Sequence, residues 1–84
     1  MPTQTMETIS QRVIELISVH HEIPKDQISL DSQFVADFGF DSLEVMEFVM
    51  TCEEEFDIAV SDEDSQTLQT VRDAVREIQK KLSP

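Results

Sequence analysis

Apolar residues recur every three or four positions in three stretches of this 84-residue chain, the spacing of one buried face of a helix. From about Thr5 to His20 the stripe consists of Met6, Ile9, Val13, Leu16, Ile17 and His20. From about Ser42 to Phe56 it consists of Val45, Val49, Cys52 and Phe56, with Met46 and Phe48 on its flanks. From about Val71 to Leu82 it consists of Val71, Ala74, Val75, Ile78 and Leu82. No stretch alternates convincingly as a half-buried strand does, so the pattern predicts helices only.

Cap signals predict where these helices begin. Asp41 or Ser42 can cap the second helix, and Glu44 follows Asp41 at the spacing of a capping box. Two further pairs predict a short third helix and the start of the last one: Ser61 with Asp64, and Thr70 with Asp73.

The segment "KDQISLDSQFVADFGF", residues 25–40, is predicted to be a long ordered loop. Ile28, Leu30 and Phe34 would anchor it to the core, and Gly39, the only glycine, would turn it into the second helix. Residues 1–84 therefore predict one domain. Its fold class is all-α, a small irregular four-helix bundle with a long loop between helices 1 and 2 and a short helix 3.

Charge is segregated along the chain, whose formal net charge is -12. Between Asp26 and Val71 there are thirteen acidic residues and no Lys or Arg, whereas the basic residues lie outside this stretch, at Arg12, Lys25, Arg72, Arg76, Lys80 and Lys81. Such a field repels phosphate backbones and anionic lipid, so nucleic acid is excluded as a partner. The field favours partners with basic patches, although acidity that only keeps a small protein soluble is the alternative.

Neither a membrane span nor a signal peptide is predicted, because no run of about 18 apolar residues occurs. A cytoplasmic location is expected. The single cysteine, Cys52, excludes an intramolecular disulfide and a cysteine-rich zinc site. It shares the apolar line of the second helix and is interpreted as a small core residue.

Ser42 is the candidate for chemistry, as a helix cap, a nucleophile or a point of attachment. A serine hydrolase needs a neighbouring base and usually an elbow with a glycine two residues before and two residues after the serine. Phe40 and Glu44 occupy those two positions around Ser42, so the elbow is absent. The histidines, His20 and His21, lie at the end of the first helix, and a domain of this size cannot easily shield an acyl intermediate from water. No catalytic residues are therefore predicted, and the chain is not expected to be an enzyme.

A dedicated metal site is not predicted either. The acidic segments lack the central glycine and alternating ligands of an EF-hand loop, so only weak divalent binding through charge is expected. Attachment suits Ser42 better: a phosphate ester in the first turn of a helix lies near free N–H groups and the positive end of the helix dipole. Gly39 would leave a modifying enzyme access to that turn.

The string "DFGFDSLEVMEFVMTCEEEFDI", residues 37–58, closely resembles the signature of the acyl carrier proteins. In that family an Asp-Ser-Leu motif at the head of the second helix carries phosphopantetheine on its serine. The likeness extends to "DQISLDSQFVADFG", "VSDEDSQTL" and "TVRDAVREI". The resemblance implies that 4′-phosphopantetheine from coenzyme A is attached to Ser42 by a phosphopantetheinyl transferase. It also implies a surface that docks acyl-processing enzymes, consisting of Asp41, Leu43, Glu44, Glu47, Glu53 and Glu54, on a protein expected to be a monomer.

The cargo is less well specified than the carrier. The string "GFDSL" with Phe40 resembles polyketide carrier domains, whereas "EFVMTCEEEF" resembles carriers of the fatty-acid type. Phe48 and Cys52 stand at positions where leucine is common in the family. An acyl pocket is predicted from Phe40, Met46, Val49 and Cys52, with Met46 and Met50 otherwise interpreted as packing residues. The expected function is delivery of acyl thioesters to fatty-acid or polyketide-type enzymes. The alternatives are a peptidyl or other specialised carrier, and a small acidic helical interaction module without a prosthetic group, in which Ser42 only caps a helix.

Overall fold

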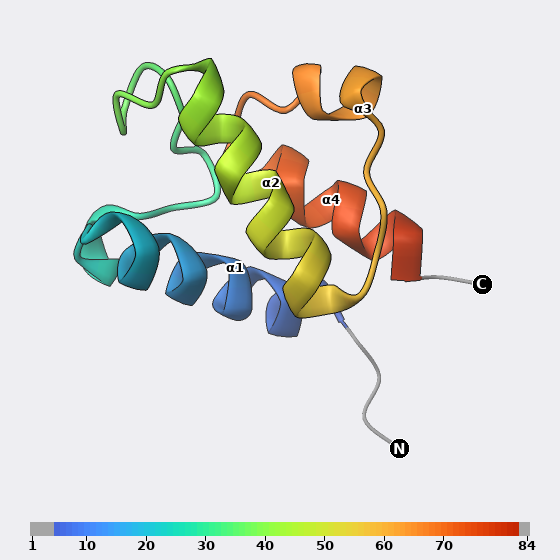
Figure 1. The fold of residues 1–84 in the computed structure, drawn as a ribbon. Helices are drawn as coiled ribbons and strands as arrows, with labels where there is room; N and C mark the ends of the chain where they lie inside the picture. Colours follow the sequence, from blue (N-terminus) through green and yellow to red (C-terminus); the bar gives the residue numbers. More distant parts are fainter. Residues whose placement is uncertain (1–4, 83–84) are drawn as a thin grey trace.

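The computed structural model describes residues 5–82, and the predicted domain of residues 1–84 extends at both ends into residues outside this part. Its elements are α1 (Met6–His21), the short 3-10 helix η1 (Lys25–Gln27), α2 (Ser42–Phe56), α3 (Asp62–Gln66) and α4 (Val71–Leu82). Helix α1 packs along α4, α2 contacts both of them, and α3 packs on α2 (Figure 1). The predicted all-α fold and its four helices are confirmed.

The caps predicted from residue spacing also form. The Ser61 side chain accepts the N–H of Asp64 at 3.1 Å, which begins α3. At the start of α4, the Thr70 hydroxyl accepts the N–H of Asp73 at 3.2 Å, and the Asp73 carboxylate accepts the N–H groups of Gln69 and Thr70, both at 3.1 Å. Burial alone would raise the pKa of Asp73, but these hydrogen bonds outweigh it and the pKa is lowered.

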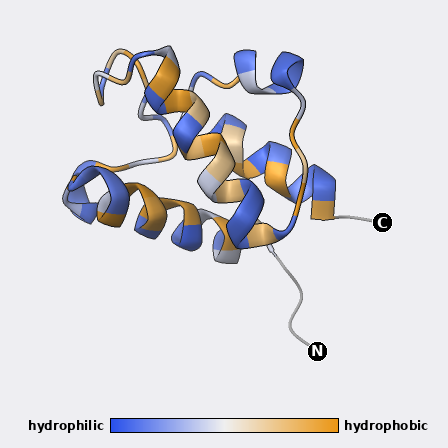
Figure 2. Cartoon of the chain, in the orientation of Figure 1, coloured by the Kyte–Doolittle hydropathy of each residue, from blue (hydrophilic) through white to orange (hydrophobic). Residues whose placement is uncertain are grey.

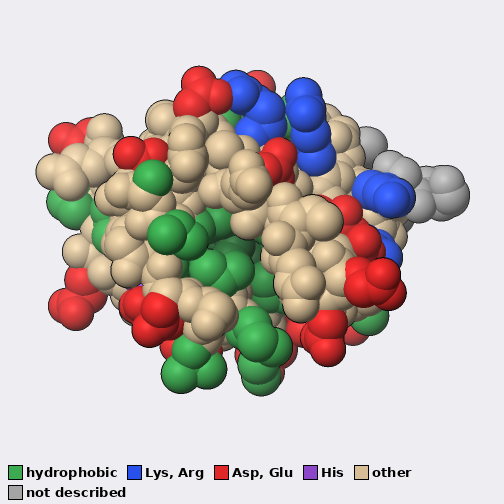
Figure 3. Space-filling view, turned by 90° about the horizontal axis from the view of Figure 1, so that it is seen from above, with side chains coloured by type: hydrophobic (Ala, Val, Ile, Leu, Met, Phe, Trp, Pro, Cys, Tyr) green, Lys and Arg blue, Asp and Glu red, His purple; other side chains and the backbone are tan. Residues whose placement is uncertain are grey.

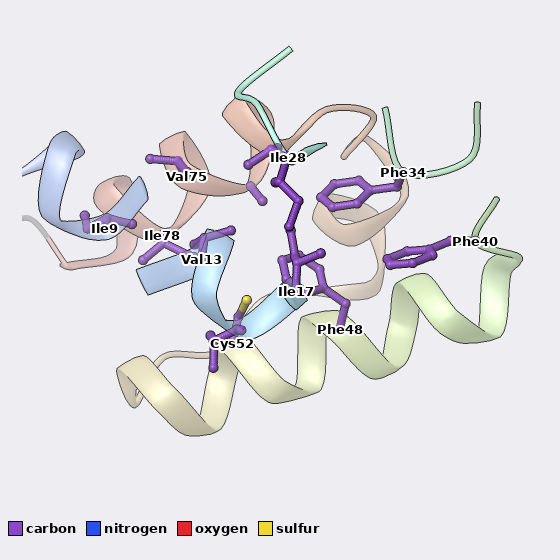
Figure 4. Close-up of a cluster of buried hydrophobic side chains, with 13 residues drawn as sticks. Ile9, Val13, Ile17, Ile28, Phe34, Phe40, Phe48, Cys52, Val75 and Ile78 are labelled. Atoms are coloured by element: carbon purple, nitrogen blue, oxygen red, sulfur yellow. The ribbon is translucent and has the colours of Figure 1, made fainter. Parts of the chain in front are cut away.

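A single hydrophobic core joins α1, α2 and α4 (Figure 4). Its side chains are Ile9, Val13, Leu16, Ile17, Ile28, Phe34, Phe40, Phe48, Cys52, Val71, Ala74, Val75 and Ile78. Helix α3 has no stripe of this kind and is hydrophilic along its length (Figure 2). It is held by the Ser61 cap at its start, by the ion pair of Asp64 with Lys81 and by its contact with α2, rather than by a buried apolar face.

The face of α2 that enters the core differs from the predicted one. Phe48, predicted on a flank, is 2% exposed, whereas Val45 and Phe56, predicted on the buried line, are only half-buried. The reason is the long loop, which packs Phe34 against Phe48 with ring centroids 5.1 Å apart and so gives α2 a neighbour on that side. The predicted inner line of α2 is therefore rotated toward Phe48.

Helix α1 ends differently as well. The spacing predicts His20 in the apolar stripe, but its side chain is exposed. Its neighbour His21 is half-buried and lies against Phe40, with ring centroids 4.3 Å apart. The imidazole at the end of α1 thus covers the core where the loop enters α2.

The long loop is fixed to the beginning of α4 by main-chain hydrogen bonds. The N–H of Phe34 donates to the carbonyl of Gln69 at 3.0 Å, and the N–H of Val71 donates to the carbonyl of Ser32 at 3.0 Å. An isolated antiparallel bridge joins Gln33 and Thr70 at the same place. Because Ile28 and Phe34 are also buried, as predicted, the loop forms an ordered wall beside the start of α2.

Candidate functional site

Ser42 is the first residue of α2 and is exposed. The cap of this helix is Asp41, whose carboxylate accepts the N–H of Glu44 at 2.8 Å. The Glu44 carboxylate in turn accepts the N–H of Asp41 at 3.2 Å, which completes the capping box. Among residues 5–82 the Ser42 hydroxyl has no hydrogen-bond partner, so its side chain plays no part in capping.

The backbone around Ser42 favours an anion on its hydroxyl. The residue lies in the first turn of a 15-residue helix, where free N–H groups and the helix dipole stabilise negative charge. Gly39 precedes it with a φ of 73°, a left-handed conformation that suits glycine, and a side chain added there would meet nothing within 4 Å. Glycine is thus required by the turn, and the space beside the turn is open.

A hollow of about 410 Å³ lies beside Ser42, between α2 and α3. We call it the outer hollow, and its lining is Val35, Ser42, Val45, Met46, Asp62, Ser65, Gln66 and Leu68. Figure 3 views this end of the molecule and shows hydrophobic side chains gathered in a recess, with Asp and Glu side chains around it and Lys and Arg confined to one edge. An apolar group attached to Ser42 would find its nearest shelter here.

A second, smaller space lies in the core between α2 and α4. We call it the inner cavity; it measures about 10 Å³ and is lined by Phe48, Val49, Cys52, Val60, Leu68, Ala74, Glu77 and Ile78. Leu68 borders both spaces.

Three of the four residues of the predicted acyl pocket line one or the other of these two spaces. Met46 lines the outer hollow, and Val49 and Cys52 line the inner cavity. Phe40 lines neither space, because it packs between His21 and Phe34 at the other end of α2 from Cys52 (Figure 4). Sequence reasoning missed Val35, Ser65 and Leu68, since these belong to the loop, α3 and the last connection, whose positions beside α2 depend on tertiary packing.

The glutamates predicted for docking fall into two groups. Glu47 and Glu54 are exposed and border a shallow hollow beside the end of α1. Glu44 and Glu53 are partly buried: Glu44 belongs to the capping box, and the Glu53 carboxylate accepts the N–H of Val60 at 2.8 Å. Glu47 and Glu54 are therefore the glutamates with carboxylates most available to a partner.

Three apolar side chains are exposed on the same outer face of α2. Leu43 is 65% exposed, Met46 48% and Met50 59%. The interpretation of both methionines as packing residues is therefore wrong. They follow Leu43 at spacings of three and seven, so the inward rotation of Phe48 leaves this stripe facing solvent.

Cys52 is a core residue, as predicted. Its thiol is buried, and burial, with the nearby charges of Glu53 and Glu55, raises its pKa to about 12. Since the thiolate is the reactive form, this side chain is not a nucleophile near neutral pH.

Between Thr5 and Leu82, no three His, Cys, Asp or Glu side chains are grouped to hold a metal ion. None of the helices in the described part of the chain has the length and apolar character needed to cross a membrane.

Comparison with known proteins finds a family model and relatives that match most of the chain. Residues 11–78 match a family model described as "Phosphopantetheine attachment site". Over 76 residues the chain is 40% identical to a protein of Buchnera aphidicola subsp. Acyrthosiphon pisum (strain Tuc7) named "Acyl carrier protein". That alignment covers 90% of this chain and 95% of the Buchnera protein.

Proposed function

Because this chain belongs to the acyl carrier protein family, we propose that Ser42 is the residue that carries its 4′-phosphopantetheine. The chain is a carrier and not itself an enzyme. When attached, the group supplies a terminal thiol that holds acyl groups as thioesters. The observation that carries the assignment is the free hydroxyl of Ser42, exposed in the first turn of α2 while Asp41 and Glu44 cap the helix.

The surroundings of Ser42 fit a phosphodiester. Its oxygens would lie beside the free N–H groups of the first turn, and the turn at Gly39 leaves a transferase room to approach. The competing function is an interaction module in which Ser42 only caps a helix. It is disfavoured because the side chain that caps α2 belongs to Asp41.

The docking surface proposed for partner enzymes consists of Asp41, Leu43, Glu44, Glu47, Glu53 and Glu54. Exposure of Glu47, Glu54 and Leu43, together with the lack of Lys and Arg between Asp26 and Val71, supports it. A phosphopantetheinyl transferase and acyl-processing enzymes with basic patches would be steered to this face, and the apolar stripe would then contact them directly.

The acyl chain is proposed to lie between α2 and α3, in the outer hollow and, after local expansion, the inner cavity. Each buried CH₂ would contribute roughly 0.8 kcal/mol before the cost of ordering the chain. Helix α3, which has no apolar stripe, is the element that would move to admit it.

We further propose that residues 1–84 form one carrier domain that works as a monomer in the cytoplasm. The single core shared by α1, α2 and α4 supports one domain. The net charge of -12 opposes self-association of like surfaces.

The attachment is tested by incubating the protein with coenzyme A and a broad-specificity phosphopantetheinyl transferase, followed by intact mass measurement. The wild type and Ser61→Ala should gain one arm, and Ser42→Ala should gain none. A wild-type protein that gains no arm, or an arm on Ser42→Ala, would overturn the assignment.

A further inference from the structure

Two methionine side chains lie in solvent on the outer face of α2. The large apolar side chains that are exposed among residues 5–82 are Val19, Val35, Leu43, Met46 and Met50, so the apolar stripe of α2 supplies three of the five. Met50 follows Met46 by one turn of the helix, which puts both thioethers on the same face. A small solute in water can therefore reach both.

The other sulfur-containing side chains of the described residues are better protected. Met6 is half-buried and packs against the core. Cys52 is 4% exposed, and burial raises the pKa of its thiol to about 12, so the reactive thiolate is scarce near neutral pH. Met1 lies outside the described residues. Among residues 5–82, an oxidant in solution meets Met46 and Met50 first.

A thioether reacts with a peroxide without being deprotonated first. The sulfur gives an electron pair to one oxygen of hydrogen peroxide, so that an S–O bond forms while the O–O bond breaks. The sulfur is oxidised to a sulfoxide, and the second oxygen leaves as hydroxide, which takes up the remaining proton to become water. The apolar side chain thereby becomes polar.

Both methionines belong to the face proposed for docking, and the inference rests on that proposed function. Met50 borders the shallow hollow together with Glu47 and Glu54, and Met46 borders the outer hollow beside Ser42. The glutamates would meet the basic groups of a partner, which leaves the methionines to be buried against its apolar surface. A sulfoxide oxygen buried there loses water without gaining a donor, and this weakens the complex.

We propose that Met46 and Met50 form a reversible oxidation site, at which a peroxide converts the thioethers to sulfoxides and so weakens the docking of partner enzymes on α2. The fold is retained, because neither side chain is part of the core. Methionine sulfoxide reductase reverses the change: two thiols supply the electrons and become a disulfide, and the sulfoxide oxygen leaves as water. The docking face thus responds to oxidants while the attachment site at Ser42 stays intact.

The test treats the full chain, before any arm is attached, with dilute hydrogen peroxide and then removes the peroxide. Digestion after glutamate separates Met46 from Met50, because Glu47 lies between them, and mass spectrometry gives the oxidised fraction of each. Both should gain one oxygen before Met6 does. With coenzyme A and a broad-specificity phosphopantetheinyl transferase, kcat/KM for loading should fall about ten-fold, mainly through KM.

Two measurements separate weaker docking from damage to the fold. The melting temperature of the oxidised protein should fall by no more than about 4 °C, as for a change at the surface. Methionine sulfoxide reductase with a thiol should restore the loading rate.

Variants assign the effect to these two residues. Met46→Leu with Met50→Leu, compared with its own untreated rate, should load equally well before and after peroxide, whereas Met6→Leu should remain as sensitive as the wild type. The inference is overturned if Met46 and Met50 are oxidised without a loss of loading, if the double variant stays sensitive, or if the loss accompanies unfolding. An untreated wild type that gains no arm would instead overturn the proposed function, and this inference with it.

Discussion

Asp41 and Glu44 form a reciprocal cap at the start of α2. The Asp41 carboxylate accepts the main-chain N–H of Glu44 at 2.8 Å, and the Glu44 carboxylate accepts that of Asp41 at 3.2 Å. Ser42 lies between them with its hydroxyl free. The arrangement separates two roles that sequence alone leaves on the same residues: the acids hold the end of the helix, and the serine is available for modification.

Ser42→Ala should therefore abolish attachment of the arm without weakening the fold. Since the hydroxyl makes no capping bond, the free energy of unfolding should change by no more than about 0.5 kcal/mol. Asp41→Ala removes the cap and should lose about 0.5–2 kcal/mol. Urea unfolding of the two variants measures the contrast, and equal losses would show that the serine also caps.

Docking should depend on the exposed glutamates. Glu47→Lys with Glu54→Lys should slow association with a basic transferase, most strongly at low salt, because the change removes electrostatic steering and leaves the core untouched. Stopped-flow association rates across a salt series measure this, with Glu7→Lys as the single-charge control on α1. Unchanged association rates at low salt would show that the acidic face serves only to keep the protein soluble.

Neighbouring glutamates on α2 should differ in their effect on stability. Glu53→Ala removes the acceptor for the N–H of Val60 and should lower the free energy of unfolding by about 1–3 kcal/mol. Glu54→Ala, at an exposed position one residue later, should change it by no more than about 0.5 kcal/mol. Thermal or urea unfolding compares the pair, and similar losses would refute a structural role for Glu53.

The length of the sheltered acyl chain should depend on Cys52. Stability of Ser42-linked saturated forms should rise with chain length until the space between α2 and α3 is full, and Cys52→Leu should bring that plateau to shorter chains because leucine occupies part of the inner cavity. A melting series in both proteins measures it. Melting temperatures independent of length in both would mean that the chain stays in solvent.

Stability should depend on pH through Asp73. Its pKa is lowered in the folded state, so its contribution is present above the unfolded value near 3.8 and is lost as the pH falls through the folded value. Asp73→Ala should cost about 0.5–2 kcal/mol at neutral pH, and the difference from wild type should shrink below about pH 4. Thr70→Ala removes a hydroxyl that accepts the N–H of Asp73 and also helps to lower the Asp73 pKa, so its cost should shrink only in part as the pH falls.

The features that sequence predicts well are local. The start of α2 follows from Asp41 and Glu44, and the start of α4 from Thr70 and Asp73, because the atoms that form each cap lie within three residues of each other. Ser42 stands out for the same reason, since its motif and its helix register are contiguous in the chain.

The features that sequence predicts poorly depend on contacts between distant segments. Phe48 enters the core because Phe34 packs on it from the loop, and that rotation leaves Met50 in solvent. Leu68 borders both spaces beside α2 from a connection that has no periodic pattern. None of these positions is fixed by helical spacing alone.

The seam between the long loop and the start of α4 also governs how the chain folds. The hydrogen bonds from Phe34 to Gln69 and from Val71 to Ser32 close a large loop of chain that contains the whole of α2 and α3. Closing such a loop costs entropy before any distant contact compensates for it, so formation of this seam should limit the folding rate. Substitutions on the outer face of α2 lie away from the seam and should leave that rate unchanged. The sequence of the surface that partner enzymes contact can therefore change without slowing the folding of the protein.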